Sequence, residues 1–364
     1  MDTDTITNAL ASNSLPNFTT NPNCKGLAII TGGSSGIGYS LALRASSLHL
    51  TVVILDLNPT TFPTVIADCK NAGATDCVAY QCDVSSFTSV QTVANTVLAT
   101  YSDLPVTLIC ANAGYGGPPL LSGTASDIQN QHDVLINGIV WTVKAFQKRF
   151  LKQKEPCVLV GTSSLAGLFP AGGSYGVGKH GAVAVMEALY GELNSMNLDH
   201  TVTCHVLCPG IVSTGITQNS AELNGGVAGH EGVRQTTEEA KQSLRGLAPT
   251  ELMRRAYMLA FRLVLEESGM PSSYAADTVM KGIETGTFYL IMDHPDERYS
   301  TNSDMSIALR HRRLEIGAPP PSRADFLNSN NGGLVESVMN RAQQLMVEAT
   351  RESVEERTKI KANM

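Results

Sequence analysis

The stretch that decides the fold of this chain is Thr31-Gly32-Gly33-Ser34-Ser35-Gly36-Ile37-Gly38. It follows a short apolar run over residues 27–31 and precedes a segment of helical length. Glycines between a strand and a helix permit a tight turn, so that the backbone approaches a pyrophosphate closely and the N–H groups of the helix N-terminus can bind it. The stretch therefore predicts a strand, a phosphate-binding turn and a helix, in that order.

Short apolar runs alternate with segments of helical length along most of the chain. The runs are rich in Val, Ile, Leu and Cys at both odd and even positions, which is typical of parallel strands that are buried on both faces. Repeated alternation of such strands with helices predicts an α/β fold with a doubly wound, parallel, seven-stranded sheet, the Rossmann fold. The predicted strands cover residues 27–31, 51–56, 77–83, 107–112, 157–163, 201–208 and 288–293.

The two ends of the chain do not follow this alternation. Residues 1–24 are polar and are predicted to be a disordered N-terminal arm. The Rossmann domain is predicted over residues 25–295. Residues 296–364 are predicted to be a C-terminal extension, which has a helical pattern of apolar residues over 333–358.

Residues 217–271 are long for a connection between a strand and the helix that follows it, and they are predicted to be an insertion. An apolar helix is expected to begin at Pro249 and to run through Leu265. The next helix is expected to have Ser272 or Ser273 as its N-cap. We interpret the insertion as a mobile lid over a substrate pocket, with a static insertion as the alternative.

The composition excludes several classes of protein. The net charge is −7 and the pI is about 5.6, so the chain lacks the basic footprint of a nucleic-acid-binding protein. No apolar run approaches the roughly 20 residues that a membrane-spanning helix needs. The polar N-terminus lacks the basic segment of a signal peptide. We therefore expect a cytoplasmic protein without a membrane span and without a nucleic-acid partner.

Eight cysteines are present, and several of them fall within predicted strands. A disulfide framework is not expected in a chain of this length without a secretion signal. Cys204 and Cys208 have a spacing that occurs in metal sites, but no second pair and no suitably spaced histidine completes it. We expect buried free thiols, a reducing compartment and no bound metal.

A second informative run is Gly173-Ser174-Tyr175-Gly176-Val177-Gly178-Lys179-His180. On a helix, residues four apart lie on one face, so that Tyr175 and Lys179 are neighbours. A free tyrosine has a pKa of about 10 and is a poor base at neutral pH. A nearby ammonium favours the phenolate and lowers that pKa, so the pair is suited to proton transfer at a carbinol or carbonyl oxygen.

Three further strings follow the fourth, fifth and sixth predicted strands. They are Asn112-Ala113-Gly114, Thr162-Ser163-Ser164 and Pro209-Gly210-Ile211-Val212-Ser213-Thr214. Each string alone is a weak signal, but their joint order and spacing resemble the short-chain dehydrogenase/reductase family over residues 25–293. The resemblance implies a Rossmann fold and oxidoreductase activity on an alcohol or ketone with a nicotinamide cofactor.

The resemblance also implies four catalytic residues, Asn137, Ser164, Tyr175 and Lys179. Tyr175 is the acid and base, Lys179 adjusts its pKa and binds the nicotinamide ribose, and Ser164 binds the substrate oxygen. Ser163 stays open as the alternative to Ser164. Asn137 lies in a helix predicted over 127–150 and holds a water that links Lys179 to solvent. Gly138, next to Asn137, fits a local distortion of that helix.

The cofactor-binding residues that the resemblance implies follow the ends of the predicted strands. The glycine-rich turn holds the pyrophosphate, Asp83 contacts the adenine, and Val212 and Thr214 hold the nicotinamide amide and a phosphate. The implied set is Gly32, Ser34, Ser35, Gly36, Ile37, Gly38, Asp56, Asp83, Val84, Asn112, Ala113, Gly114, Tyr175, Lys179, Pro209, Gly210, Val212 and Thr214.

Asp56 ends the second predicted strand and bears on the choice of cofactor. A carboxylate at this place accepts hydrogen bonds from both ribose hydroxyls and repels a 2′-phosphate. No Arg or Lys lies in the glycine-rich turn or directly after Asp56. NAD is therefore predicted as the cofactor, in preference to NADP.

The expected reaction is hydride transfer between the nicotinamide cofactor and a secondary alcohol or ketone. The substrate is expected to be a lipophilic small molecule such as a steroid, terpenoid or polyketide alcohol, because residues 252–265 are apolar with few charges. Two alternatives stay open: the same fold used for a non-redox cyclisation or epimerisation, and a nucleotide-binding scaffold without catalysis.

Helices over 127–150 and 174–195 are expected to pair across a two-fold axis, as the resemblance implies. The chain would then form a homodimer or a homotetramer. The apolar residues expected at this interface are Val134, Leu135, Val183, Met186 and Leu189.

Overall fold

The computed structural model describes residues 25–168, 173–214, 216, 237–293, 295 and 333–362. The chain divides into two compact units. The first, here called the sheet unit, comprises the described residues up to Gly210, residues 214 and 216, and Pro271–Met292. The second, here called the helical unit, comprises Ile211–Ser213, residues 237–270 and the described residues from 293 onward.

Several predicted segments lie outside the described residues. They are the N-terminal arm, residues 1–24, the first part of the predicted insertion, residues 217–236, and the residues 296–332 that precede the C-terminal helix.

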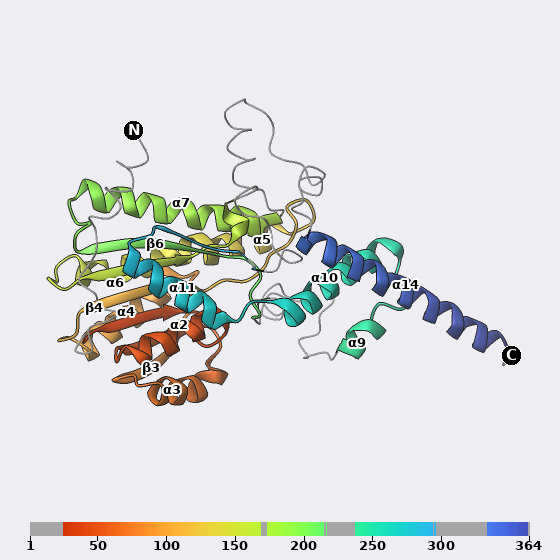
Figure 1. The fold of residues 1–364 in the computed structure, drawn as a ribbon, viewed down its shortest axis with the longest axis horizontal. Coiled ribbons are helices and arrows are strands. Elements are labelled where there is room, and N and C mark those ends of the chain that lie inside the picture. Colours follow the sequence, from red (N-terminus) through yellow and green to blue (C-terminus); the bar gives the residue numbers. More distant parts are fainter. Residues whose placement is uncertain are drawn as a thin grey trace, which may run out of the picture. The chain divides into compact units, whose positions relative to one another are not determined.

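A parallel sheet of seven strands forms the centre of the sheet unit, in the order β3-β2-β1-β4-β5-β6-β7 (Figure 1). All six neighbouring strand pairs are parallel. The predicted doubly wound fold is therefore confirmed, and the predicted strand ends differ from the observed ones by at most two residues. The strands are β1 (Leu27–Thr31), β2 (Thr51–Asp56), β3 (Asp76–Gln81), β4 (Val106–Ala111), β5 (Cys157–Thr162), β6 (Val202–Pro209) and β7 (Tyr289–Met292).

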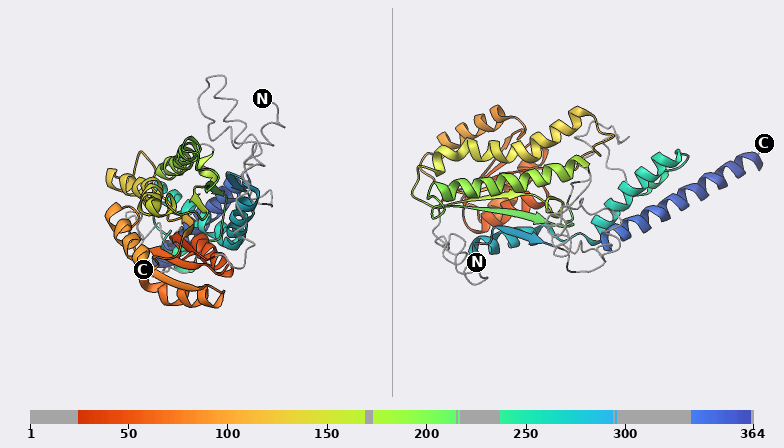
Figure 2. Two further views of the ribbon diagram at one scale, coloured as in Figure 1. Left: turned by 90° about the vertical axis from the view of Figure 1, so that its left-hand side faces the viewer. Right: turned by 90° about the horizontal axis from the view of Figure 1, so that it is seen from above.

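Helices cover both faces of this sheet (Figures 1 and 2). On one face α2 packs against α11 and α3, and on the other face α6 packs against α4 and α7. Strands β1, β2, β4 and β5 are buried along nearly their whole length, which explains their apolar residues at both odd and even positions. The helices are α2 (Gly36–Ser47), α3 (Phe62–Asn71), α4 (Phe87–Thr100), α5 (Ala125–His132), α6 (Gly138–Phe150), α7 (Gly173–Ser195) and α11 (Ser272–Thr285), with short 3₁₀ turns η1 (Pro59–Thr61) and η3 (Leu165–Gly167).

The helix predicted over 127–150 is not a single α-helix. A π-helical segment, η2 (Asp133–Asn137), separates α5 from α6 and ends at Asn137. The next residue, Gly138, packs against Val84, which follows β3: a Cβ atom at Gly138 would lie 3.1 Å from Val84 Cγ2. The distortion expected beside Asn137 is therefore present, as a wide helical turn.

Two further expectations about helices are wrong. Pro271 precedes α11 as its N-cap without a side-chain hydrogen bond, and the Ser272 hydroxyl instead bonds the Ser40 hydroxyl of α2 at 2.7 Å. Three of the five residues expected at a subunit interface are buried within a single chain, namely Leu135, Val183 and Met186. Val183 and Met186 of α7 belong to the core beside the sheet, and Leu135 of η2 packs against Gly178 of α7, where an added Cβ atom would lie 2.7 Å from it.

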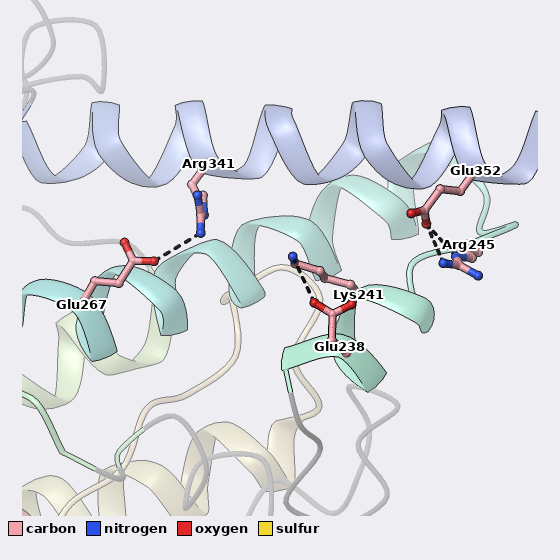
Figure 3. Close-up of polar contacts among 6 residues, drawn as sticks. All are labelled: Glu238, Lys241, Arg245, Glu267, Arg341 and Glu352. Atoms are coloured by element: carbon pink, nitrogen blue, oxygen red, sulfur yellow. Dashed lines mark hydrogen bonds and ion pairs between the residues drawn. The ribbon is translucent and has the colours of Figure 1, made fainter.

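The helical unit contains α9 (Thr237–Gln242), α10 (Pro249–Ser268) and α14 (Gly333–Ala362). Helices α10 and α14 lie side by side and run antiparallel, since Arg341, early in α14, pairs with Glu267 at the end of α10 (Figures 1 and 3). A second ion pair joins Arg245, which precedes α10, to Glu352 late in α14 at 2.7 Å. The apolar seam between the helices is formed by Leu244, Ala256, Leu259, Ala260, Leu263, Val264, Val338, Ala342, Leu345 and Ala349.

The predicted buried thiols are confirmed for the cysteines that the structure describes, all seven of which are free and buried. Burial raises the pKa of Cys110, Cys204 and Cys208 to about 12, which keeps these thiols protonated at neutral pH. Across the described part of the chain, no helix is both long and apolar enough to cross a membrane.

Candidate active site

The glycine-rich turn between β1 and α2 is shaped to receive a phosphate group. Gly32 and Gly36 have φ angles of +63° and +54°, which side chains other than hydrogen disfavour. A Cβ atom at Gly38 would collide with the Gly32 carbonyl oxygen, so helix and turn meet closely. The N-cap residue Ser35 makes no side-chain hydrogen bond to the first turn of α2, whose N–H groups lack intrahelical acceptors. This cradle fits the pyrophosphate of a dinucleotide, as the sequence predicted.

The end of β4 is joined to this turn through Thr31. The Thr31 hydroxyl accepts hydrogen bonds from the backbone N–H of Asn112 at 2.9 Å and of Ala113 at 3.1 Å. The Asn112 side-chain amide donates to the Thr31 carbonyl at 3.2 Å. A Cβ atom at Gly32 would lie 2.9 Å from Ala113 Cα. The predicted cofactor-lining string of β4 therefore lies directly beside the phosphate turn.

Asp56 lies at the carboxyl end of β2 and also contacts the glycine-rich turn. Its Oδ2 accepts a hydrogen bond from the Ser34 backbone N–H at 3.1 Å, and its Oδ1 accepts one from the Asn58 N–H at 3.2 Å. These two bonds fix the carboxylate next to the turn. A fixed negative charge at this place disfavours a further phosphate group.

Asp83 and Val84 follow β3 and differ in exposure. The Asp83 Oδ1 atom accepts hydrogen bonds from the Ser85 N–H at 2.9 Å and from the Ser85 hydroxyl at 2.7 Å. The carboxylate is exposed, whereas Val84 is buried against Gly138. The exposed carboxylate is accessible to an adenine amino group, the contact that the resemblance implies for it.

Ser163 and Ser164 have different partners, and only one of them faces Tyr175. The buried Ser163 hydroxyl donates to the Lys179 carbonyl at 2.7 Å and so fastens β5 to α7. The Ser164 hydroxyl donates to the Pro209 carbonyl at 3.3 Å and accepts from the Ala166 N–H at 3.2 Å, and its interaction with Tyr175 lowers the pKa of that phenol. The geometry favours Ser164 over Ser163 as the group that binds a substrate oxygen.

Tyr175 and Lys179 lie one turn apart on α7, as their spacing predicted. The Lys179 Nζ atom is 5.6 Å from the centroid of the Tyr175 ring and donates to the Thr162 carbonyl at 2.9 Å. Lys179 is buried, and desolvation lowers the pKa of its ammonium to about 8. The positive charge of Lys179 thus lies over one face of the Tyr175 ring.

The pKa of Tyr175 is raised above its ordinary value, opposite to the direction expected from Lys179 alone. Burial of the phenol raises this pKa, and the hydrogen bond from Ser164 lowers it by less. The protonated phenol is therefore the stable form near neutral pH, and it can donate a proton to an oxygen next to it.

The π-helical segment, the β4 end and Lys179 converge at Gly114. A Cβ atom there would lie 2.9 Å from Leu135 Cδ2 of the π-helix and 3.4 Å from Lys179 Nζ. Asn137, at the end of the same segment, donates from its side chain to Asp133 Oδ1 at 2.7 Å. Its expected place in a water-mediated relay stays a prediction.

Of the residues after β6, Pro209, Gly210 and Thr214 belong to the sheet unit. The Gly210 N–H donates to the Met292 carbonyl at 2.6 Å, and the Thr214 side chain lies against Gly36, where an added Cβ atom would be 3.1 Å away. Val212 belongs to the helical unit, where it is buried and bridges to Met270 as an isolated parallel pair.

Two residues near Tyr175 were not among the predicted site residues. Gln131 of α5 and Ser174 of α7 are fully buried and hydrogen-bonded to one another. The sequence carries no local signal for this bond, because the two residues are separated by 43 positions and polar residues at such places are ordinarily exposed.

The family model described as short chain dehydrogenase matches residues 26–224 of this chain. Together with the parallel sheet and the glycine-rich turn, this match shows that the chain belongs to the short-chain dehydrogenase family. Members of this family are oxidoreductases that act on alcohols and ketones with NAD or NADP, so this is the class of enzyme that the fold and site define.

Several curated relatives are dehydrogenases. A 1-deoxy-11-beta-hydroxypentalenate dehydrogenase of Streptomyces avermitilis is 31% identical over 196 residues, which are 52% of this chain and 70% of the relative. A mitochondrial borneol dehydrogenase of Lavandula x intermedia is 29% identical over 62% of this chain and 84% of its own length. The human epidermal retinol dehydrogenase 2 is 30% identical over 52% of this chain and 61% of its own length.

Solved structures share the fold. A short chain dehydrogenase/reductase from Burkholderia phymatum in complex with NAD has a TM-score of 0.68 and 24% identity, over 83% of this chain and 99% of that chain. An alcohol dehydrogenase from the archaeon Thermococcus sibiricus, complexed with 5-hydroxy-NADP, has a TM-score of 0.52 and 21% identity, over 71% and 90% of the two chains.

Proposed function

We propose that this chain interconverts a secondary alcohol and its ketone on a lipophilic small molecule, with NAD as the preferred cofactor. The observation that carries the proposal is the buried Lys179 ammonium 5.6 Å from the centroid of the Tyr175 ring, together with the interaction of Tyr175 with Ser164 at the carboxyl end of β5. The neighbouring hydroxyls of Ser164 and Tyr175, next to the Lys179 ammonium, are suited to bind and protonate one substrate oxygen.

Each side chain of this group has a distinct task. Ser164 donates a hydrogen bond to the substrate oxygen, and Tyr175 gives its proton to that oxygen in ketone reduction or takes it in alcohol oxidation. The Lys179 ammonium stabilises the phenolate that remains after the proton has left. Ser163 holds the Lys179 backbone against β5 and so maintains the spacing between Ser164 and Tyr175. A bound nicotinamide dinucleotide supplies or accepts the hydride.

The residues that would hold this cofactor follow the carboxyl ends of successive strands. The turn of Gly32, Gly36 and Gly38 offers the helix N-terminus of α2 to the pyrophosphate. Asp56 would bind the adenosine ribose, Asp83 the adenine, and Lys179 the nicotinamide ribose. The other members of the proposed set are Ser34, Ser35, Ile37, Val84, Asn112, Ala113, Gly114, Tyr175, Pro209, Gly210, Val212 and Thr214, and Asn137 would order the relay water beside Lys179.

Preference for NAD rests on the carboxylate of Asp56. It is held against the phosphate turn by the Ser34 N–H at 3.1 Å, and the residues that follow it, Leu57 and Asn58, carry no positive charge. A 2′-phosphate would meet this carboxylate without a cation to neutralise it. Asp56→Asn removes the negative charge and keeps an oxygen that can accept the Ser34 N–H. This variant should therefore have a smaller preference for NAD over NADP.

A lipophilic substrate is supported by the loop that follows β4. The Pro118 carbonyl accepts the Ser174 N–H, so this loop reaches the residue next to Tyr175. Leu120 and Leu121 of the same loop are 49% and 103% exposed. We propose that these two leucines, which follow the anchored Pro118 by two and three residues, provide an apolar surface for the substrate. The names of the relatives denote alcohols of this kind: hydroxypentalenate, borneol and retinol.

We further propose a cytoplasmic homodimer or homotetramer that associates through α6 and α7. Apolar side chains that stay exposed on or next to α7, namely Val177, Tyr190 and Met196, support such a contact. Light scattering at micromolar concentration tests it, and a monomer would count against it.

The predicted lid over 217–271 is proposed for the same enzyme; altered hydrogen exchange over 217–248 on binding of NAD and substrate would support it.

Absorbance at 340 nm tests the proposed function with a panel of secondary alcohols, from small alcohols to terpenoid and steroid alcohols. We expect reduction of NAD with the larger alcohols, a lower rate with NADP, and a smaller difference between the two cofactors in Asp56→Asn. Equal kcat/KM for NAD and NADP in the wild type would refute the preference. Turnover without any change in the cofactor would favour the non-redox alternative.

A further inference from the structure

Gln131 is a fully buried amide of α5 that uses both of its ends. Its Nε2 donates to the Tyr115 carbonyl at 3.1 Å, and its Oε1 accepts a hydrogen bond from the Ser174 hydroxyl. The donor to Tyr115 has to be the amide nitrogen, so the oxygen has to face Ser174. A buried amide satisfied at both ends tolerates one orientation only, which makes Gln131 a rigid link.

Ser174 lies in the first turn of α7, directly before Tyr175, and is fully buried. Its backbone N–H donates to the Pro118 carbonyl at 3.0 Å, and its single hydroxyl proton is shared between the same carbonyl, at 2.9 Å, and the Gln131 amide oxygen. N–H groups in the first turn of a helix have no acceptor within the helix. The Pro118 carbonyl supplies that acceptor, and so the loop after β4 anchors the beginning of α7.

Two glycines show how closely these segments approach. A Cβ atom at Gly117 would collide with the Gln131 amide oxygen. Gly173, the first residue of α7, has a φ of +77°, and a Cβ atom there would lie 3.0 Å from the Pro118 carbonyl oxygen. The loop after β4, helix α5 and the start of α7 thus meet at one junction, which has no room for a side chain at either glycine.

We propose that Gln131 and Ser174 are positioning residues, which fix the first turn of α7 on the loop 115–118 and thereby hold the Tyr175 hydroxyl on Ser164. This inference rests on the proposed function, since it assigns Tyr175 as the proton donor and acceptor. Tyr175 directly follows Ser174, and it lies on the one turn of α7 that this junction anchors. The spacing between Tyr175 and Ser164 therefore depends on the two buried side chains.

The same junction sets the position of the apolar loop relative to Tyr175. Pro118 is bonded to Ser174, and the exposed Leu120 and Leu121 follow it two and three residues later. A substrate that packs its apolar body on these leucines is then presented to Tyr175 at a fixed distance. Loss of the junction should lower kcat more than it raises KM, because orientation of the reacting groups is lost while most of the binding surface stays.

Ser174→Ala and Gln131→Leu test the inference, with Ser195→Ala as the matched control at the exposed far end of the same helix. Ser174→Ala removes one hydroxyl and keeps the backbone bond to Pro118, so it is the variant least able to unfold the chain. For each variant we would measure thermal unfolding, kcat and KM for alcohol oxidation, the pH profile of kcat/KM, and hydrogen exchange over residues 173–180.

The inference predicts that both variants lose about 10- to 100-fold in kcat with little change in KM. The pH profile should move toward lower pH, because burial is the main cause that raises the pKa of Tyr175 and a loosened first turn exposes the phenol. Amides 174–178 should exchange faster, while Ser195→Ala behaves as wild type. A lowered melting temperature with unchanged kcat and unchanged pH profile would overturn the inference, since it would show a merely structural bond.

The exchange measurement separates this inference from the proposed function. A wild type that oxidises no alcohol, with variants that exchange faster over 174–178, would refute the proposed function and keep the anchoring of α7. A wild type that is active, with exchange over 174–178 unchanged in both variants, would refute the anchoring and keep the proposed function.

Discussion

The sheet unit and the helical unit of this chain bury their side chains in different ways. In the sheet unit, strands such as β4 and β5 are covered on both faces along all of their residues. In the helical unit, α10 and α14 share a single apolar seam, which consists largely of alanine, leucine and valine. Two ion pairs between exposed side chains, Arg341–Glu267 and Arg245–Glu352, flank the seam (Figure 3).

This difference separates chemistry from stability. In the sheet unit, the core is formed by the strands together with the helices that cover them, and the half-buried Ser164 and Tyr175 hydroxyls lie beside this core, where they can be removed without opening it. In the helical unit, the seam is the core, so that a change in it affects the pairing of two helices directly. Substitution of a site hydroxyl in the sheet unit should therefore lower activity and leave stability unchanged. Substitution in the seam of the helical unit should lower stability.

The largest effect is expected for Tyr175→Phe in the sheet unit. Loss of the hydroxyl removes the proton donor and acceptor, so kcat should fall by roughly 10²–10⁴-fold or more. Cofactor binding, followed by NADH fluorescence, and the melting temperature should stay close to those of the wild type. Near-normal kcat in this variant would show that the Tyr175 hydroxyl does not carry the proton in the reaction.

The matching substitution in the helical unit is Leu345→Ala. Leu345 is 3% exposed within the seam, and loss of a buried leucine costs about 2–5 kcal/mol of stability. Amides over 338–349 should lose protection in hydrogen exchange, while amides of β1 and β4 keep it. Val347→Ala is the control, because Val347 is 62% exposed. Unchanged protection of α14 in Leu345→Ala would mean that the seam does not hold the two helices together.

In the sheet unit, Lys179 is needed for the proposed reaction, but burial of its ammonium lowers the stability of the folded chain. Burial lowers its pKa to about 8, below the roughly 10.4 of an unfolded lysine. Between these two values the unfolded chain binds more protons than the folded chain, so this group makes the free energy of unfolding rise with pH across that window. Lys179→Met should abolish that rise and stabilise the cofactor-free chain at pH 7 by roughly 1–3 kcal/mol.

Urea unfolding at pH 7 and at pH 9.5 checks this expectation, together with the rate of alcohol oxidation. The variant should be more stable at pH 7 and nearly inactive. A variant that is less stable at pH 7 would show that the hydrogen bond from Lys179 to the Thr162 carbonyl outweighs the cost of burying the charge.

The smallest effect is expected for the surface ion pairs of the helical unit. Arg245 and Glu352 are 38% and 47% exposed, and pairs of this kind contribute about 0–1 kcal/mol. A double-mutant cycle with Arg245→Ala and Glu352→Ala should give a coupling energy below about 1 kcal/mol that falls further in 0.5 M salt. A larger, salt-independent coupling would show that the seam alone does not stabilise this unit.

Much of the sheet unit could be predicted because its signals are local. Each strand is a short run of β-branched or other apolar residues between turns, and the glycine-rich turn shows where β1 ends and α2 begins. Tyr175 and Lys179 lie four positions apart, so their proximity on α7 follows from helical geometry alone. The choice between Ser163 and Ser164 needed the structure, because both are adjacent to the strand end and only their partners distinguish them.

Contacts between distant residues could not be predicted from the sequence. Gln131 is polar and lies in a helix, so nothing local indicates that it is buried against Ser174. The bond from Arg245 to Glu352 joins residues 107 positions apart, and neither helix pattern indicates its partner. The raised pKa of Tyr175 has the same origin, because burial depends on all the surrounding segments, whereas the spacing along the helix indicates only the neighbour Lys179.

Transfer of a label from substrate to cofactor tests the central claim most directly, namely that Tyr175 of the sheet unit serves an alcohol oxidoreductase. The measurement uses a secondary alcohol that is turned over at 340 nm, deuterated at its carbinol carbon, with mass spectrometry of the reduced nicotinamide dinucleotide. We predict one deuterium in each reduced cofactor molecule with the wild type, and labelled cofactor that forms roughly 10²–10⁴-fold more slowly with Tyr175→Phe. Product that forms without deuterium in the cofactor, or equal rates of labelling by the two proteins, would contradict the account.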